Sequence, residues 1–85
     1  MDDLLRQRSK THGNWGKQAK VAVELKGWLL ASAEETDLSP TQYEAISHIC
    51  VKLSRIVCGD PNFKDHWDDI AGYAMLAAKE CEEQQ

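Results

Sequence analysis

One segment with a start signal, an apolar period and a stop signal constrains the fold of this chain most. Ser39 can cap a helix, Pro40 suits its first position, and Gln42 completes a capping box. Gly59, a common helix-ending residue, follows the last apolar position. Between these signals, apolar side chains recur at the helical spacings of three and four: Tyr43, Ile46, Ile49, Cys50, Leu53, Ile56 and Val57. The pattern predicts a helix over 40–58.

Two further helices are expected, over about 14–35 and 63–82, with Asn14 capping the first. A short additional helix is expected within residues 1–10, and no segment alternates as a strand would. The apolar positions are Val21, Leu25, Trp28 and Leu29 in the first helix, and Phe63, Trp67, Ile70, Ala74, Ala77 and Cys81 in the last. The sequence therefore predicts an all-α helical bundle in one domain, 1–85. Its predicted core includes Ile49, Leu53, Trp67, Ile70 and Ala74.

Chain length limits how much apolar surface this domain can bury by itself. The chain has 85 residues, 42% of them hydrophobic, with three tryptophans that are expected in the core. So small a core often recruits another subunit. The last helix also carries small residues that allow close helix approach, namely Ala71, Ala74, Ala77 and Ala78. A homo-oligomer is therefore expected.

Charge and cysteine content restrict the partners and the compartment. The net charge of −4 argues against binding to the nucleic-acid backbone, which needs a basic surface. No apolar run is long enough for a membrane span, and no signal peptide is recognisable. The three cysteines form no CxxC pair and are expected as buried small hydrophobes. A cytoplasmic protein is expected.

The candidate binding residues are charged side chains on the last two helices. Asp65 and Asp69 lie four apart, so their carboxylates share one side of a helix, with Gly72 beside them. They are candidate Mg²⁺ ligands. Lys52 and Arg55 form a candidate phosphate clamp. The alternatives are helix-dipole charges, salt bridges between the two helices, and a solvated face with Glu44–His48 pairing.

A second candidate lies at the start of the first helix. His12 and Asn14 flank a glycine there, and free backbone N–H groups at a helix start can bind an anion. An ordinary turn with a cap is the alternative interpretation. No nucleophile motif or Walker loop is present. His48 and Cys50, two residues apart, face different ways.

Three motifs together resemble a small helical family of tailed-phage and prophage genomes. They are Arg8 followed by His12-Gly13, then Lys52-x-x-Arg55, then Asp65-x-x-x-Asp69-Ile70-Ala71-Gly72-Tyr73-Ala74. The resemblance covers about residues 8–78. It implies a phage protein acting in the host cytoplasm.

That family in turn resembles the all-α MazG-type nucleoside triphosphate pyrophosphatases. Those enzymes hold Mg²⁺ with an E-x-x-E helix and an E-x-x-D helix. Asp65 and Asp69 match the second element approximately, whereas the first is missing, because Glu44 stands alone. The resemblance therefore implies nucleotide binding more than hydrolysis.

The combined prediction is a protein that binds a nucleotide-like or phosphorylated ligand without efficient hydrolysis. It would manage nucleotide pools or sequester a host defence signal. Two alternatives stay open. One is a Mg²⁺-dependent pyrophosphatase, and the other is a protein-interaction module that inhibits a host factor.

Overall fold

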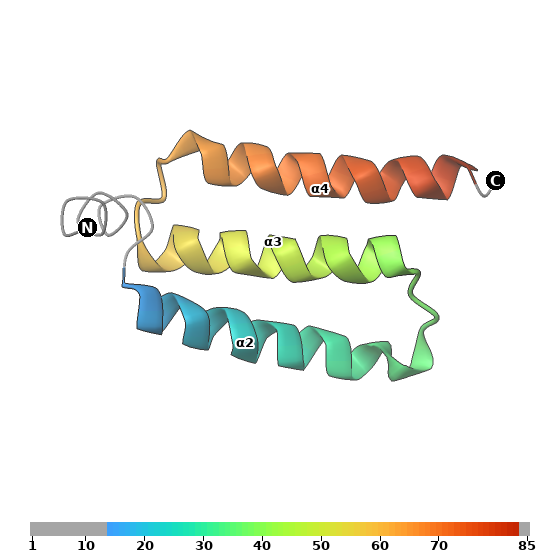
Figure 1. Cartoon of the computed structure of the whole chain (residues 1–85), viewed down its shortest axis with the longest axis horizontal. Helices are drawn as coiled ribbons and strands as arrows, with labels where there is room; N and C mark the ends of the chain where they lie inside the picture. The colour runs from blue at the N-terminus through green and yellow to red at the C-terminus, as the bar shows by residue number, and fades with distance from the viewer. Residues whose placement is uncertain (1–13, 84–85) are drawn as a thin grey trace.

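The computed structural model describes residues 14–83, and they form three α-helices joined by short connections (Figure 1). A four-residue 3₁₀ helix, η1, extends the first α-helix. The described residues contain no strand, so the all-α prediction is confirmed. The short helix expected within residues 1–10 lies outside the described residues. The bounds are α2 Trp15–Ala31, η1 Ser32–Glu35, α3 Pro40–Cys58 and α4 Lys64–Glu83.

Local capping signals account for the helix starts. The Asn14 side chain accepts a hydrogen bond from the Lys17 N–H at 3.0 Å. The Ser39 hydroxyl accepts from the Gln42 backbone N–H at 3.1 Å, and the side-chain Oε1 of Gln42 accepts from the Ser39 backbone N–H at 3.0 Å. Gly59 follows the last residue of α3. The predicted caps of α2 and α3 are confirmed, because each depends on residues only three apart.

The turn between α3 and α4 has its own side-chain contacts. The Asn62 N–H donates to the Asp60 carboxylate at 2.9 Å. The Trp67 indole N–H donates to the Pro61 carbonyl at 2.8 Å. These bonds hold α4 antiparallel to α3.

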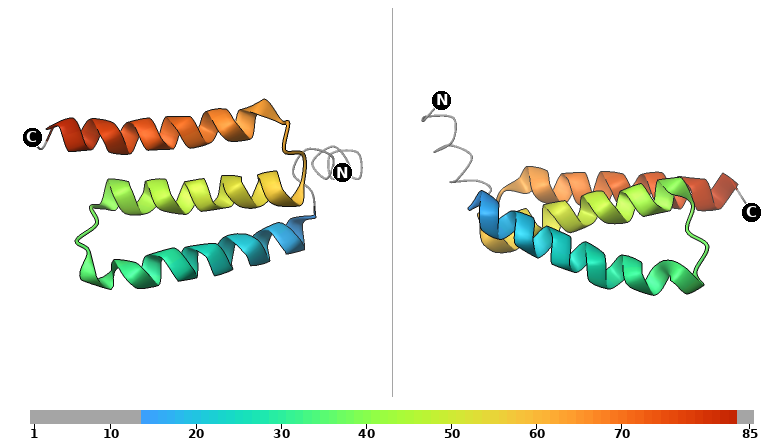
Figure 2. Two further views of the ribbon diagram at one scale, coloured as in Figure 1. Left: turned by 180° about the vertical axis from the view of Figure 1, so that it is seen from behind. Right: turned by 60° about the horizontal axis from the view of Figure 1, so that its bottom comes forward.

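The three helices form an open layer with α3 in the middle (Figures 1 and 2). The Cα atoms of α2 and α4 stay more than 8 Å apart, whereas both helices contact α3. Each outer helix therefore packs along one side only. None of the described helices is long and apolar enough to cross a bilayer.

The core of this layer is small and partly polar. Its buried apolar residues are Ala22, Ala45, Cys50 and Ile56. Three polar side chains are buried as deeply, namely Gln18, Ser54 and His66. Neither polar atom of the Gln18 amide has a hydrogen-bond partner in the part of the chain that the structure describes. Most of the large apolar residues are thus left outside the core.

The predicted core is wrong for two of its five residues. Trp67 and Ala74 are exposed, whereas Ile49, Leu53 and Ile70 are half-buried. The side of α4 that packs on α3 includes His66 and Tyr73 in place of the predicted Trp67 and Ala74, each one residue later in the chain. It carries Phe63, His66, Ile70, Tyr73 and Ala77.

The prediction that the tryptophans lie in the core is also wrong. Trp15, Trp28 and Trp67 are 70%, 81% and 51% exposed. Among the cysteines, Cys50 is buried as expected, and burial raises the pKa of its thiol. Cys58 is only half-buried, and Cys81 is exposed.

Candidate functional site

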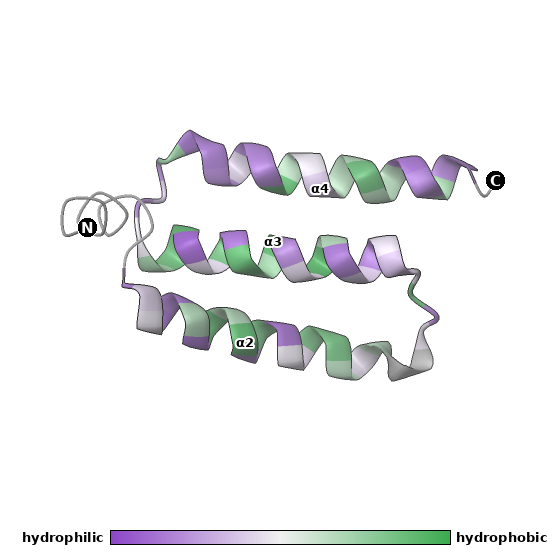
Figure 3. Cartoon of the chain, in the orientation of Figure 1, coloured by the Kyte–Doolittle hydropathy of each residue, from purple (hydrophilic) through white to green (hydrophobic). Residues whose placement is uncertain are grey.

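The open layer has two faces, and helical spacing assigns side chains to each. On α3, Ile46, Leu53 and Val57 lie on one side because they are seven and four residues apart. Glu44, His48 and Arg55 recur at four and seven on the opposite side. Figure 3 shows that apolar and polar residues alternate along each helix, as this division requires. One face of α3 is therefore apolar and the other is charged.

Contacts between α3 and α4 show which side chains of α4 join each face. The Gln42 amide, one turn before Ile46, donates to the Cys81 sulfur at 3.9 Å. The stripe of Cys81, Ala74 and Trp67 thus lies on the apolar side. On the other side, the rings of His48 and Tyr73 stack with centroids 4.7 Å apart.

The same geometry places the residues of α2. Its buried positions, Gln18 and Ala22, face α3, and α2 runs antiparallel to α3 as α4 does. α2 thus runs in the same direction as α4 but lies on the other side of α3. Because both helices are right-handed, Val21, Leu25 and Trp28 lie on the same face of the layer as the Trp67 stripe of α4. We call Val21, Leu25, Trp28, Ile46, Leu53, Val57, Trp67 and Ala74 the apolar face. We call Glu44, His48, Lys52, Arg55, Asp69 and Tyr73 the polar face.

An ion pair between α3 and α4 is the centre of the polar face. The Lys52 ammonium lies 2.8 Å from the Asp69 carboxylate, and the Lys52 side chain is only 15% exposed. The hydrogen bond from Lys52 holds the pKa of the Asp69 carboxyl below its usual value, and the charges of His66 and Arg55 add to this. The predicted interhelical salt bridge is confirmed for this pair.

The four predicted site residues come together only in part. Among the described residues, neither Arg55 nor Asp65 has an ion-pair partner within 4.0 Å. Arg55 is half-buried and close enough to lower the pKa of Asp69, whereas Asp65 is exposed. Within residues 14–83, the polar face therefore has Lys52, whose charge Asp69 neutralises, and Arg55, which takes part in no ion pair.

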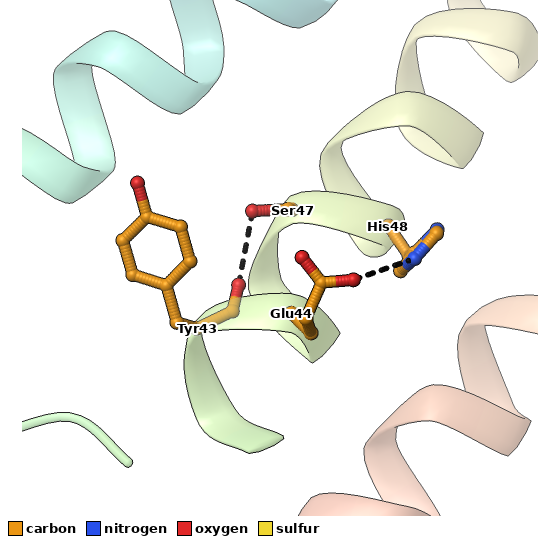
Figure 4. Close-up of polar contacts among 4 residues, drawn as sticks. All are labelled: Tyr43, Glu44, Ser47 and His48. Atoms are coloured by element: carbon orange, nitrogen blue, oxygen red, sulfur yellow. Dashed lines mark hydrogen bonds and ion pairs between the residues drawn. The ribbon is translucent and has the colours of Figure 1, made fainter. Parts of the chain in front are cut away.

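Glu44 and His48 extend the polar face along α3. The His48 imidazole Nε2 lies 3.1 Å from a Glu44 carboxylate oxygen, and the Ser47 hydroxyl donates to the Tyr43 carbonyl one turn away (Figure 4). The predicted Glu44–His48 pairing is confirmed. A shallow hollow between α3 and α4 is lined by His48, Tyr73 and Leu76, among others.

The other predicted site residues lie apart from this centre. His12 is outside the described residues, and Asn14 caps α2. Within residues 14–83, no group of three or more His, Cys, Asp and Glu side chains could hold a metal ion. Asp69 is already bound to Lys52. A metal ion at the predicted Asp65–Asp69 pair would have to displace that ammonium.

An additional carboxylate, which sequence reasoning missed, holds the far end of α4. Interactions with Ser39 and Thr41 lower the pKa of the Glu80 carboxyl. Glu80 therefore places a negative charge at the N-terminal end of α3, where the helix dipole favours one. The spacing of four and three from Tyr73 through Ala77 to Glu80 was the available signal, but Glu80 lies in a run of mostly polar residues that obscures it.

The apolar face is strongly exposed to solvent. Trp28, Val57 and Trp67 are 81%, 70% and 51% exposed, although large apolar side chains normally dominate a core. The three residues come from all three helices. The face therefore extends across the whole layer.

No protein-family model, curated protein or solved structure matches this chain. The resemblance to the phage family stays a prediction.

Proposed function

We propose that this chain is a protein-interaction module that binds a partner through the apolar face. The observation that carries the proposal is the contrast between a core of small side chains and the exposed Trp28, Val57 and Trp67. Contiguous apolar surface on a small protein marks an interaction site. Tryptophan is among the residues that contribute most binding energy when an interface covers them.

The open layer supports the same function. A closed three-helix bundle would place the apolar sides of α2, α3 and α4 against one another. Here α2 and α4 do not meet, so all three apolar sides stay accessible together. Covering the exposed part of each large side chain is favourable by about 25 cal/mol for each Å² of apolar surface removed from water, and this gain offsets the entropic cost of association.

Site-specific photo-crosslinking in cells that express the protein tests this function. A photoreactive side chain at Val57 on the apolar face should crosslink to one defined partner. The same group at Lys79, an exposed position of α4 outside both faces, is the matched control. Crosslinks of equal yield at both positions, or none at Val57, would contradict the proposal.

A second candidate function is binding of a nucleotide-like or other phosphorylated ligand, without efficient hydrolysis, on the polar face. Arg55 supports it, because this half-buried guanidinium has no ion-pair partner among the described residues and lies next to the Lys52–Asp69 pair. Arginine offers phosphate a planar pair of donors. Under the phage resemblance, such a protein would manage nucleotide pools or sequester a host signal.

Calorimetric titration with a panel of nucleotides, with and without Mg²⁺, tests the second function. Saturable binding that Arg55→Ala and Asp69→Asn abolish, while the helical spectrum is unchanged, is expected. Lys79→Ala, which removes an exposed cation of α4 outside the polar face, should bind as the parent does. Turnover of the nucleotide would favour the pyrophosphatase alternative. Binding that both site variants retain would refute the assignment of these residues.

A further inference from the structure

We infer that the partner on the apolar face is a second copy of this chain, packed face to face so that α2 of each copy lies alongside α4 of the other. This inference rests on the proposed interaction function and names its partner. The two copies are related by a two-fold axis parallel to the helices. The charges of the helices, their order in the layer and the positions of their large and small residues lead to this arrangement.

Symmetry leaves two simple ways to pack the apolar faces together. A two-fold axis parallel to the helices reverses the helix order, so α2 lies over the partner's α4 and α3 over the partner's α3. A two-fold axis across the helices keeps the order, so α2 lies over the partner's α2. Both are closed, self-complementary dimers of the kind that predominates among soluble oligomers.

The charges of the outer helices distinguish these two arrangements. α2 carries three lysines and one glutamate, a net charge of +2, whereas α4 carries two lysines and six carboxylates, a net charge of −4. The first arrangement places α2 beside the oppositely charged α4. The second places α4 beside α4, where like charges repel. Electrostatics therefore selects the axis parallel to the helices.

The same axis brings opposite charges to the same level along the helices. α2 and α4 begin at the same end of the layer and run in the same direction (Figure 1). A two-fold axis parallel to them adds no shift along their length. Lys17 and Lys20, exposed in the first turns of α2, then lie near the level of Asp68, exposed at the start of the partner's α4.

Side-chain sizes along the two helices are also complementary. Trp28 lies thirteen residues after the start of α2, and Ala77 lies thirteen residues after the start of α4. The large indole of one copy thus comes near a small stretch of the other, Ala74 to Ala78. Trp67, near the start of α4, comes within about one helical turn of Val21. Large residues therefore meet small or medium ones at both ends of the contact.

Sedimentation equilibrium of the purified full chain over a micromolar concentration series tests the dimer. The parent should have the mass of a dimer. Trp28→Glu should raise the dissociation constant by at least about tenfold, because a charge would replace a large apolar side chain that the interface covers. Leu76→Glu is the matched control, since Leu76 is also exposed but lies at the hollow on the polar side. It should leave the mass unchanged.

A charge exchange tests the arrangement of the helices. Lys20→Glu alone should weaken the dimer, and adding Asp68→Lys should restore it. If α2 lay on the partner's α2, Lys20→Glu would remove repulsion and tighten the dimer, which would overturn the arrangement proposed. Circular dichroism on each variant confirms that the helices persist, because both positions are exposed.

The outcomes separate this inference from the function on which it rests. A parent protein that is monomeric throughout the series, while Val57 still crosslinks to another protein, overturns the self-association and leaves the interaction function standing. A monomer without any specific crosslink overturns both. A dimer that Trp28→Glu and Leu76→Glu affect equally overturns the interface.

Discussion

The two faces of the layer are built from the same three helices, yet different forces act on them. On the polar face, two side chains of α3 find partners within the chain: Lys52 pairs with Asp69 at 2.8 Å, and His48 stacks on Tyr73. On the apolar face, Trp28 and Val57 are 81% and 70% exposed. Polar groups are satisfied by one well-placed partner, whereas apolar side chains need a surface that surrounds them. An open layer supplies single polar partners from the neighbouring helix, but it does not supply a surface that surrounds the apolar side chains.

The largest effect expected within one chain comes from the few residues that the layer does bury. Ile56→Ala should cost about 2–5 kcal/mol of unfolding free energy, because Ile56 is only 6% exposed. Val57→Ala, at the next position, should change the unfolding free energy of the monomer by less than about 0.5 kcal/mol. Urea denaturation at concentrations too low for assembly measures both. Equal losses would show that the apolar face is buried within a single chain.

A smaller loss should follow from changing the hydrogen bond that fixes Trp67. Trp67→Phe keeps most of the apolar surface but removes the indole N–H that donates to the Pro61 carbonyl. The expected cost is about 0.5–1.5 kcal/mol, independent of protein concentration. The comparison variant is Trp28→Phe, since the Trp28 indole N–H donates no hydrogen bond to any residue within 14–83. A loss for Trp67→Phe that depends on concentration would assign Trp67 to assembly alone.

A gain in stability is expected at Gly72, which lies beside the polar face. An added Cβ there would meet no atom within 4 Å, and alanine favours a helix by about 0.8–1.0 kcal/mol over glycine. Gly72→Ala should therefore raise the melting temperature. If a phosphorylated ligand occupies the space next to Asp69, the same change should weaken its binding while the stability still rises. Calorimetry with and without nucleotide separates these effects.

The smallest effect expected is a change in the acid sensitivity of the polar face. The pKa of Asp69 is lowered in the folded chain, so its stabilisation is present above the ordinary carboxyl pKa and is lost as the pH falls through the folded value. Asp69→Asn and Lys52→Met should both make the fall in melting temperature below about pH 4 shallower. Thermal scans between pH 7 and pH 2.5 measure it. An unchanged slope for both variants would mean that the pair does not contribute to stability.

Sequence patterns predicted the helices well and their rotation less well. In α4, Phe63, Ile70 and Ala77 belong equally to two stripes, one through Trp67 and Ala74 and the other through His66 and Tyr73. Periodicity favoured the more apolar stripe. Packing on α3 took the other one, with the His48–Tyr73 stack on its polar side. The stripe through Trp67 lies on the apolar face instead.

The charged cluster shows the same limit. Lys52 and Arg55 lie before the turn between α3 and α4, and Asp65 and Asp69 lie after it, with Arg55 and Asp65 at about the same level along the two helices. The structure pairs Lys52 with Asp69. Level along two helices follows from counting residues, but the pairing also depends on how each helix is rotated about its axis. That rotation is fixed by the packing of α3 on α4.

The sequence by itself determined where the helices begin and end, because caps such as Ser39 with Gln42 act over three residues and need no tertiary context. Only the tertiary structure decided that α2 and α4 stay apart, and with that which side chains are buried. An apolar stripe specifies that a helix has a side to cover but not what covers it. That depends on contacts between residues far apart in the chain, so Trp28 and Trp67 have the spacing of core residues and yet lie on a surface.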